Sequence, residues 1–228
     1  MSGSAAGERD RPRGSPETYT WPLVAIVVAI LPQVVVPVHD RVGPPLAVPI
    51  IEAAVFVIMV VIAAKPGPVP RRARPLVLSL FGVLILANAA AAARLVVLVL
   101  DGGKVDGVAL TANRLLVAGS LVLATNVITF GLLYWQLDSG GPIGRAAEPM
   151  PYPDFQFPQT ATIGLAAAGW RPRFPDHLYL AFTNVVAFSP TDTMPLSGRA
   201  KALMAMQSLI SVAVLVVVLA RVINILPT

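Results

Sequence analysis

A polar break interrupts the apolar C-terminal third of the chain at Ser189, Thr191 and Asp192. Two hydroxyl oxygens and a carboxylate lie there within four residues, and oxygen ligands of these kinds line cation pores. The mostly apolar run 179–190 leads into the break, and a long apolar segment follows it. The pattern therefore predicts an oxygen-rich tip between two apolar segments.

Two charged residues, Glu52 and Arg94, lie inside apolar segments and fall toward the same membrane face. A charge at the centre of a membrane helix costs about 2.5–3.5 kcal/mol on insertion scales, so each charge needs a partner or a cavity. An ion pair between the two is the simplest interpretation. The alternative is a charged vestibule or proton path lined by Glu52.

Uncharged polar residues also interrupt the apolar segments, and hydrogen bonds between such residues commonly join membrane helices. Asn88 and Asn126 are expected to pack at helix–helix contacts for this reason. Gln207 and Ser211 could be their partners, and they would line the pore if the last apolar segment forms an inner helix.

No enzyme, metal or cofactor chemistry is predicted. The chain has no cysteine, which excludes disulfides and thiolate ligands. His39 and His177 each have an aspartate beside them, but the two pairs are predicted on opposite membrane faces, and a metal site needs three or four convergent ligands. Each pair is interpreted as a boundary or capping feature, and no catalytic site is predicted.

The composition indicates an integral membrane protein. Of the 228 residues, 56% are hydrophobic and 13% are charged, against roughly 25% charged in soluble domains. The net charge is +5, but no basic helix or aromatic platform suited to nucleic acid is present. The expected partner is therefore the lipid bilayer and not nucleic acid.

Five apolar segments are long enough to cross a hydrocarbon core of ~30 Å at ~1.5 Å per residue, which predicts an all-α membrane bundle. They are Trp21–Val38, Pro45–Ala64, Leu76–Leu100, Leu110–Trp135 and Ala202–Leu226. The predicted organisation is a disordered tail (1–20), four membrane helices (21–135), an ordered Pro/Gly-rich loop (136–177) and a C-terminal hairpin with the last helix (178–228).

Basic residues give the expected orientation. They gather in the N-terminal tail, between the second and third segments, and between the fourth and fifth. The positive-inside rule then places the N-terminus in the cytoplasm of a bacterial cell, with the chain in the cytoplasmic membrane.

The segment 179–190 is too short to span a membrane as a helix. Irregular backbone at membrane depth must be buried in protein or line water, and a half-membrane helix that turns back through a polar loop meets that condition. A re-entrant hairpin is thus expected. The alternative is an interfacial helix that lies flat on the membrane.

The stretch "FTNVVAFSPTDTMPLSGRAKALMAMQSLISVAVLVVVLARVI" resembles the pore helix, filter and inner helix of two-span potassium channels. The resemblance implies a homotetramer. Ser189 and Thr191 replace the filter glycines and Pro190 fixes its own φ, so a potassium-type carbonyl ladder is not expected. An ungapped alignment places Thr183 at the end of the pore helix and gives the filter as Ala187, Phe188, Ser189, Pro190, Thr191 and Asp192.

The whole chain, especially "PDFQFPQ" and "AFSPTDTMPL", also resembles a group of bacterial multi-pass membrane proteins of unknown function. Three functions stay open: a channel-like protein, a non-conducting scaffold or accessory subunit, and a small secondary transporter that uses Glu52 and Arg94. The absence of an internal repeat disfavours the transporter. The channel module enters its loop from outside, whereas the charge rule places Asp192 inside, so the two signals conflict.

Overall fold

The structure is a computed structural model. It describes residues 17–35, 47–64, 73–101, 104–105, 108–109, 111–146, 152–162, 164–167, 169–187 and 192–225. Its helices are α1 (Thr20–Val35), α2 (Ala47–Ala64), α3 (Ala73–Leu100), α4 (Ala112–Leu137), α5 (Gly141–Ala146), α6 (Pro158–Ala161), α7 (Phe174–Val186) and α8 (Gly198–Ile225). A single 3-10 turn, η2 (Asp138–Gly140), links α4 to α5.

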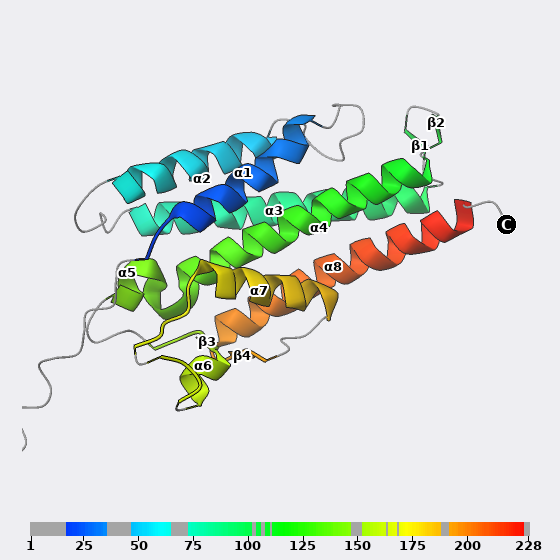
Figure 1. Cartoon of the computed structure of the whole chain (residues 1–228). Coiled ribbons are helices and arrows are strands. Elements are labelled where there is room, and N and C mark those ends of the chain that lie inside the picture. The colour runs from blue at the N-terminus through cyan, green and yellow to red at the C-terminus, as the bar shows by residue number, and fades with distance from the viewer. Residues whose placement is uncertain are drawn as a thin grey trace, which may run out of the picture.

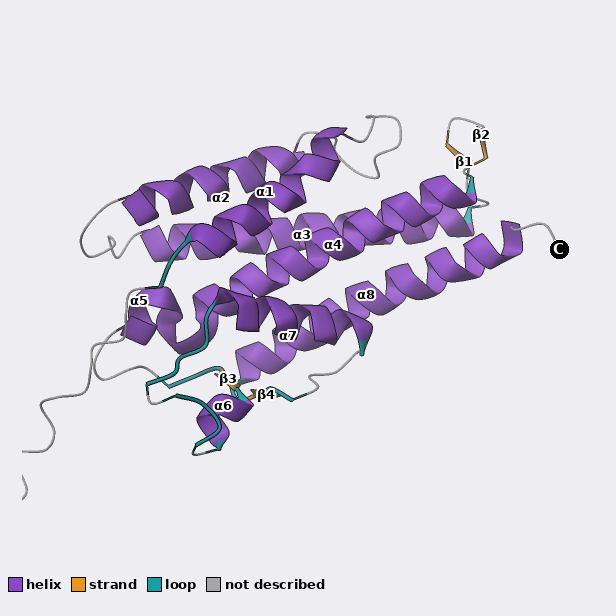
Figure 2. Cartoon of the chain, viewed as in Figure 1, coloured by secondary structure: helices purple, strands orange, loops and turns teal. Residues whose placement is uncertain are grey.

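The described part of the chain is mostly helical (Figure 2). Three helices, α3, α4 and α8, are long and apolar enough to cross a membrane, and the apolar helices α1 and α2 are shorter. The prediction of a helical, multi-pass membrane protein is confirmed at this level. The helix lengths do not decide whether α1 and α2 also span, so the count of five spans stays a prediction.

Within the described residues, two short antiparallel strand pairs accompany the helices. β1 (Lys104–Val105) pairs with β2 (Val108–Ala109) between α3 and α4. β3 (Phe155–Gln156) pairs with β4 (Met194–Pro195), with Phe155 opposite Pro195. The second pair matters for the fold because it joins the segment before α7 to the segment before α8.

The long helices run side by side, and α1, α3, α7 and α8 all begin at the end of the bundle that carries η2 and α5 (Figure 1). We call this the α5 end. β1 and β2 lie at the opposite end, where α8 also finishes (Figure 1). α7 runs from the α5 end along α4 and α8 and stops part-way, after which β4 lies back at the α5 end. The segment from α7 to β4 therefore begins and finishes at the same end of the bundle.

α7 spans Phe174–Val186, whereas the sequence pattern placed the half-helix at residues 179–190. The helix begins earlier because Pro175 lies in its first turn, where a missing N–H costs nothing. The Asp176 carboxylate accepts a hydrogen bond from the Arg173 backbone N–H (2.7 Å), which caps the helix. Four of the filter-like residues, 188–191, lie outside the described residues.

α4 and α7 pack closely at Gly131. A Cβ atom at this position would lie 3.1 Å from the Leu178 Cα atom of α7, which is tighter than an ordinary contact. Small residues let membrane helices approach backbone to backbone. Gly131 therefore sets the distance between α4 and the half-helix.

We expect Gly131→Ala to destabilise the protein by roughly 1–3 kcal/mol, because the added methyl group must push α7 away from α4. Gly82→Ala on α3 is the matched control, since no atom lies within 4 Å of the position that its methyl group would take. The control should be neutral or stabilising by up to ~1 kcal/mol. Thermal unfolding in detergent, followed by tryptophan fluorescence, measures both; equal midpoints for the two variants would contradict the close packing.

Candidate functional site

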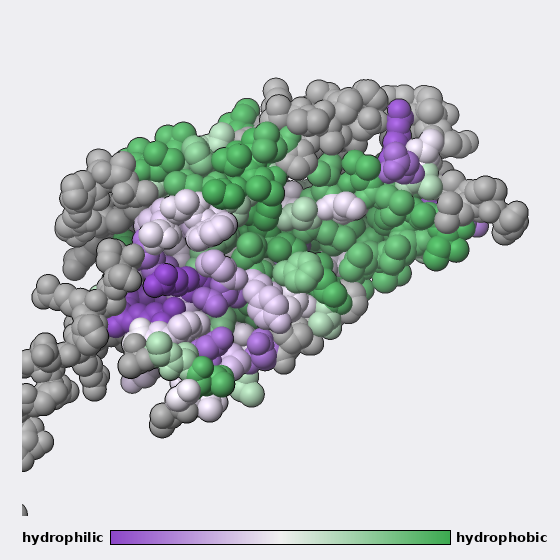
Figure 3. All heavy atoms as spheres, in the orientation of Figure 1, coloured by the Kyte–Doolittle hydropathy of each residue, from purple (hydrophilic) through white to green (hydrophobic). Residues whose placement is uncertain are grey.

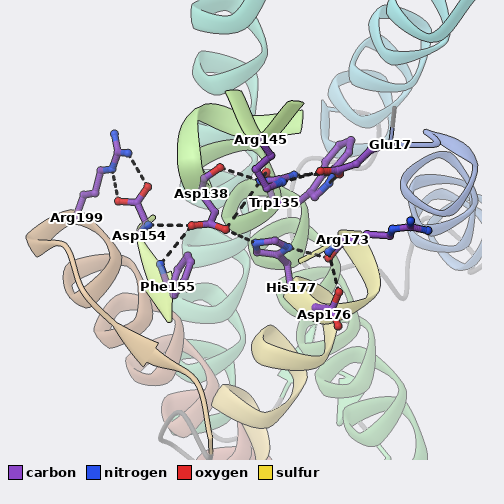
Figure 4. Close-up of polar contacts among 10 residues, drawn as sticks. All are labelled: Glu17, Trp135, Asp138, Arg145, Asp154, Phe155, Arg173, Asp176, His177 and Arg199. Atoms are coloured by element: carbon purple, nitrogen blue, oxygen red, sulfur yellow. Dashed lines mark hydrogen bonds and ion pairs between the residues drawn. The ribbon is translucent and has the colours of Figure 1, made fainter. Parts of the chain in front are cut away.

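A group of charged and aromatic side chains fills the α5 end (Figure 4). We call it the α5-end cluster. It joins the N-terminal segment before α1, the end of α4, η2 and α5, β3, the start of α7 and the start of α8. Its members are Glu17, Trp135, Asp138, Arg145, Asp154, Phe155, Arg173, Asp176, His177 and Arg199.

Asp138 lies at the centre of the cluster and its side chain is buried. One carboxylate oxygen, Oδ1, accepts hydrogen bonds from the backbone N–H groups of Asp154 (2.8 Å) and Phe155 (3.3 Å). The other, Oδ2, lies 3.1 Å from His177 Nε2 and 4.0 Å from Arg145 Nη1. These donors and the nearby cation all favour the ionised carboxylate.

His177 bonds at both ring nitrogens. Nδ1 lies 2.8 Å from the Arg173 carbonyl oxygen, which can only accept, so Nδ1 carries a hydrogen. Nε2 faces the Asp138 carboxylate, which also only accepts when ionised. The ring therefore joins the Arg173 carbonyl at the start of α7 to the Asp138 carboxylate in η2.

The aromatic side chains Phe155 and Phe157 enclose this pair. Their ring centroids lie 6.3 and 5.3 Å from that of His177, both in edge-on geometry. Water is kept from the imidazole by this packing, which strengthens its interaction with Asp138 because the local dielectric is low.

Arg145 links the end of α4 to the N-terminal segment. Its Nη1 donates to the carbonyl oxygens of Trp135 (2.9 Å) and Asp138 (2.8 Å) at the end of α4, and the Gly141 backbone N–H also donates to the Asp138 carbonyl. Its Nε and Nη2 bind the Glu17 carboxylate at 2.6 and 3.1 Å. The indole N–H of Trp135 donates to the same carboxylate (2.6 Å), so Glu17 fixes the start of α1 against α4 and α5.

Tyr19 packs edge-on against Trp135 beside this ion pair, with ring centroids 5.3 Å apart. Burial raises the pKa of the Tyr19 phenol, and the Glu17 carboxylate raises this pKa further. The phenol therefore stays neutral at physiological pH.

The turn from α4 into α5 depends on three consecutive residues with positive φ. Ser139 has φ 49°, and Gly140 and Gly141 both have φ 79°. A Cβ atom on Gly141 would lie 2.8 Å from the Gln136 carbonyl oxygen, so the position requires glycine. This turn brings Arg145 back over the end of α4 and holds Asp138 toward α7.

Asp154 connects β3 to the start of α8. Its carboxylate binds Arg199 through two hydrogen bonds, at 2.7 and 2.6 Å, and accepts another from the Ser197 hydroxyl. Its carbonyl oxygen accepts from the Leu196 backbone N–H (2.8 Å). Because the Arg199 side chain is 54% exposed, solvent screens this ion pair far more than the Asp138–His177 pair.

A second set of polar side chains lies inside the bundle, which we call the mid-bundle cluster: Tyr134, Asn184, Gln207, Ser208 and Ser211. Gln207 Oε1 accepts from the Tyr134 hydroxyl (2.7 Å) and from Asn184 Nδ2 (2.9 Å). Gln207 Nε2 donates to the Ala181 carbonyl oxygen (2.9 Å). This one amide therefore joins α4, α7 and α8.

The structure places the predicted pore-lining residues in the interior of one chain. Gln207 and Ser211 are buried, and Ser211 donates to the Gln207 carbonyl oxygen (2.8 Å). Thr183 is buried and donates to the Leu180 carbonyl oxygen (3.0 Å). Ala187 and Asp192 are exposed, and the filter-like residues Phe188, Ser189, Pro190 and Thr191 lie outside the described residues.

The other predicted polar residues take different positions. Asn126 donates to Asn88 Oδ1 (3.2 Å), and Asn88 donates to the Val122 carbonyl oxygen (3.1 Å), so these two amides join α3 to α4. Glu52 is buried on α2, whereas Arg94 is exposed on α3. Their pairing stays a prediction.

Sequence reasoning missed the α5-end cluster. It interpreted Asp176 and His177 as a capping pair, and Asp176 does cap α7. The carboxylate that His177 binds is instead Asp138, 39 residues away. The available signal was a set of charged residues in the aromatic-rich segment 136–177, directly after an apolar segment.

Among the described residues, no group of three or more His, Asp or Glu side chains could hold a metal ion. No family model, curated protein or solved structure matches the chain. The resemblances to potassium channels and to bacterial membrane proteins therefore stay predictions. The cluster itself offers hydrogen bonds and ion pairs that hold helix ends together.

We expect His177→Ala to destabilise the protein by about 3–5 kcal/mol, because it leaves the buried Asp138 carboxylate without its histidine partner. Arg199→Ala at the same end removes the half-exposed partner of the buried Asp154 carboxylate, which keeps the Ser197 hydroxyl, and should cost less, about 1–3 kcal/mol. Thermal unfolding in detergent compares the two. Adding Asp138→Asn to His177→Ala should recover part of the loss, and no recovery would contradict a charge-based cause.

Proposed function

We propose that the chain is a multi-pass integral membrane protein with five membrane-inserted helices and one half-membrane helix, and that it acts as a non-conducting scaffold or accessory subunit. The observation that carries this proposal is the distribution of polarity: apolar side chains face outward, and the polar side chains of the helices bind one another inside.

The outward faces of the long helices are apolar. Leu86 on α3 is 69% exposed and Leu209 on α8 is 72% exposed, whereas Asn88 and Gln207 on the same helices are buried. Figure 3 shows hydrophobic side chains over the long helices and hydrophilic ones gathered near the α5 end. A lipid environment accounts for this arrangement, because exposed apolar surface on this scale is unfavourable in water.

α7 also has apolar side chains on its outer face and polar side chains on its inner face, which favours a half-membrane helix over an interfacial one. Tyr179, Phe182 and Val186 face outward, whereas His177 and Asn184 face the bundle. An interfacial helix would turn its polar side to water. With 13 residues α7 is ~20 Å long, which is enough to enter but not to cross a ~30 Å hydrocarbon core.

A scaffold is favoured over a pore because the polar groups of the hairpin are already used within one chain. Gln207, Asn184 and Ser211 make hydrogen bonds inside the bundle. The faces that α7 and α8 would offer to neighbouring copies are largely apolar.

A channel is the second candidate, and one observation favours it. Asp192 is exposed and lies six residues after the last residue of α7, where a filter carboxylate would lie in a tetramer. The basic residues Arg171, Arg173 and Lys201 near the α5 end support a cytoplasmic position for that end, so such a pore loop would enter from inside.

The membrane placement predicts how single cysteines react, and the natural chain has no cysteine to interfere. Tyr152→Cys, at a residue that is 96% exposed at the α5 end, should react with an impermeant thiol reagent from one side of the membrane. Asp101→Cys, after α3 at the other end, should react only from the opposite side. Phe182→Cys should react only after detergent is added; rapid labelling of Phe182→Cys in intact membranes would contradict a lipid-facing α7.

Ion flux separates the scaffold from the channel. We expect proteoliposomes that contain the purified chain to release K⁺ and Na⁺ no faster than empty liposomes, under a concentration gradient and under an applied voltage. Gramicidin-treated liposomes serve as the positive control. A flux that the wild type carries and that Asp192→Asn reduces would contradict the scaffold and favour the channel.

A further inference from the structure

We propose that an apolar groove beside α7 binds one acyl chain of a membrane phospholipid. The groove has a volume of about 790 Å³ and lies along α7 and α4, with Leu215 contributed by α8. This volume falls within the ~300–1,000 Å³ of ordinary ligand sites. The role of the groove rests on the proposed membrane insertion of α7.

The groove is lined by hydrocarbon side chains. α4 contributes Leu123 and Val127, among others. α7 contributes Leu178 and Phe182, and among the described residues that line the groove only Tyr179 carries a polar side-chain atom. A bound water needs about two to four polar partners, so water is a poor occupant. An empty groove would leave its lining atoms without dispersion contacts on one side, which favours an apolar occupant.

The groove follows α7 for about the depth of one lipid leaflet. Its lining on this helix begins at Pro175, in the first turn, and extends to Val186, the last residue of the helix. At ~1.5 Å per residue these two residues lie ~17 Å apart along the helix axis. One leaflet is half of the ~30 Å hydrocarbon core, or ~15 Å. A single acyl chain that enters at the α5 end therefore matches the groove in length.

The groove is also continuous with the surface that contacts lipid. Tyr179, Phe182 and Val186 line the groove and are exposed on the outer face of α7. Leu123 and Leu215 belong to α4 and α8, two of the helices that are long and apolar enough to cross a membrane. An acyl chain can therefore enter the groove sideways from the bilayer.

A membrane helix from a second copy or another protein fits the groove less well. Such helices associate through small residues, which let the backbones approach closely, and through polar side chains. Ala124 is the one small residue among the described residues that line the groove. A membrane helix also follows the whole ~30 Å core, about twice the length of the groove. A flexible acyl chain can instead bend between the bulky side chains.

Photocrosslinking tests where the acyl chain lies. The full chain is reconstituted in phosphatidylcholine bilayers that contain a trace of phosphatidylcholine with a diazirine at the end of one acyl chain, and mass spectrometry locates the adducts. We expect adducts to concentrate at Val186 and Leu215. A diazirine beside the ester group should shift them to Pro175. Adducts spread evenly over outward residues such as Leu86 and Leu209 would show only surrounding bilayer lipid and overturn the site.

A matched pair of variants locates the site. Ala124→Trp fills the groove from an exposed position on α4, so it should lower the adduct yield at Val186 and Leu215 roughly tenfold, because the bulky ring displaces the acyl chain. Ala90→Trp, at an exposed position on α3 outside the groove, should leave this yield unchanged. Equal yields in the two variants would overturn the site.

A single cysteine tests for protein in the groove. Phe182→Cys, oxidised in the bilayer, should stay monomeric, and a disulfide-linked dimer would place a second copy there and overturn the lipid assignment. Thiol labelling of the same variant reports membrane insertion separately. Protection from labelling together with evenly spread adducts would overturn the groove alone, whereas rapid labelling would overturn the insertion of α7.

Discussion

The half-helix α7 ends inside a bundle whose outer surface is apolar, and this placement constrains the rest of the structure. Polar side chains buried in the bundle cannot rely on water, so each needs a partner from a neighbouring helix. The Gln207 amide meets this need for three helices at once, because it binds Tyr134 of α4 and both Asn184 and the Ala181 carbonyl of α7. A shift of α7 along α8 would break these bonds together, so the amide fixes the position of α7 along α8.

The α5-end cluster fixes the other end of the same helix. His177 holds the first turn of α7 to Asp138, and Asp138 also binds the backbone before and within β3. β3 pairs with β4, and Asp154 holds the start of α8. The two clusters together therefore define where the chain enters the bundle and where it leaves. Gly131 complements them, because a larger residue there would push α7 away from α4.

Hydropathy was sufficient to place the long helices. The apolar segment predicted at 76–100 is α3 (Ala73–Leu100), and the one predicted at 110–135 is α4 (Ala112–Leu137). Such segments are set by the thickness of the hydrocarbon core, which is a local property of the sequence. The start of α7 was missed because a proline-rich stretch was interpreted as non-helical, although proline is favoured in a first helical turn. The Asp138–His177 contact could not be predicted, since it depends on the φ > 0 turn at Ser139–Gly141 and on pairing across 39 residues.

The same hydrogen bonds make a water-filled path along α7 unfavourable. A water-filled path along α7 within one chain would have to expose Asn184 and Gln207. It would therefore break the hydrogen bonds that hold α4, α7 and α8 together. Exchanging an intramolecular hydrogen bond for one to water costs a net ~0.5–1.5 kcal/mol, so losing these three bonds would cost roughly 1.5–4.5 kcal/mol. At ~1.4 kcal/mol per tenfold change, the open form would be populated below about one part in ten. A partner or ligand that stabilised the open form would have to bind it more tightly than the closed form by at least that factor. The outward face of α7 is apolar, so it offers such a partner mainly hydrophobic contacts.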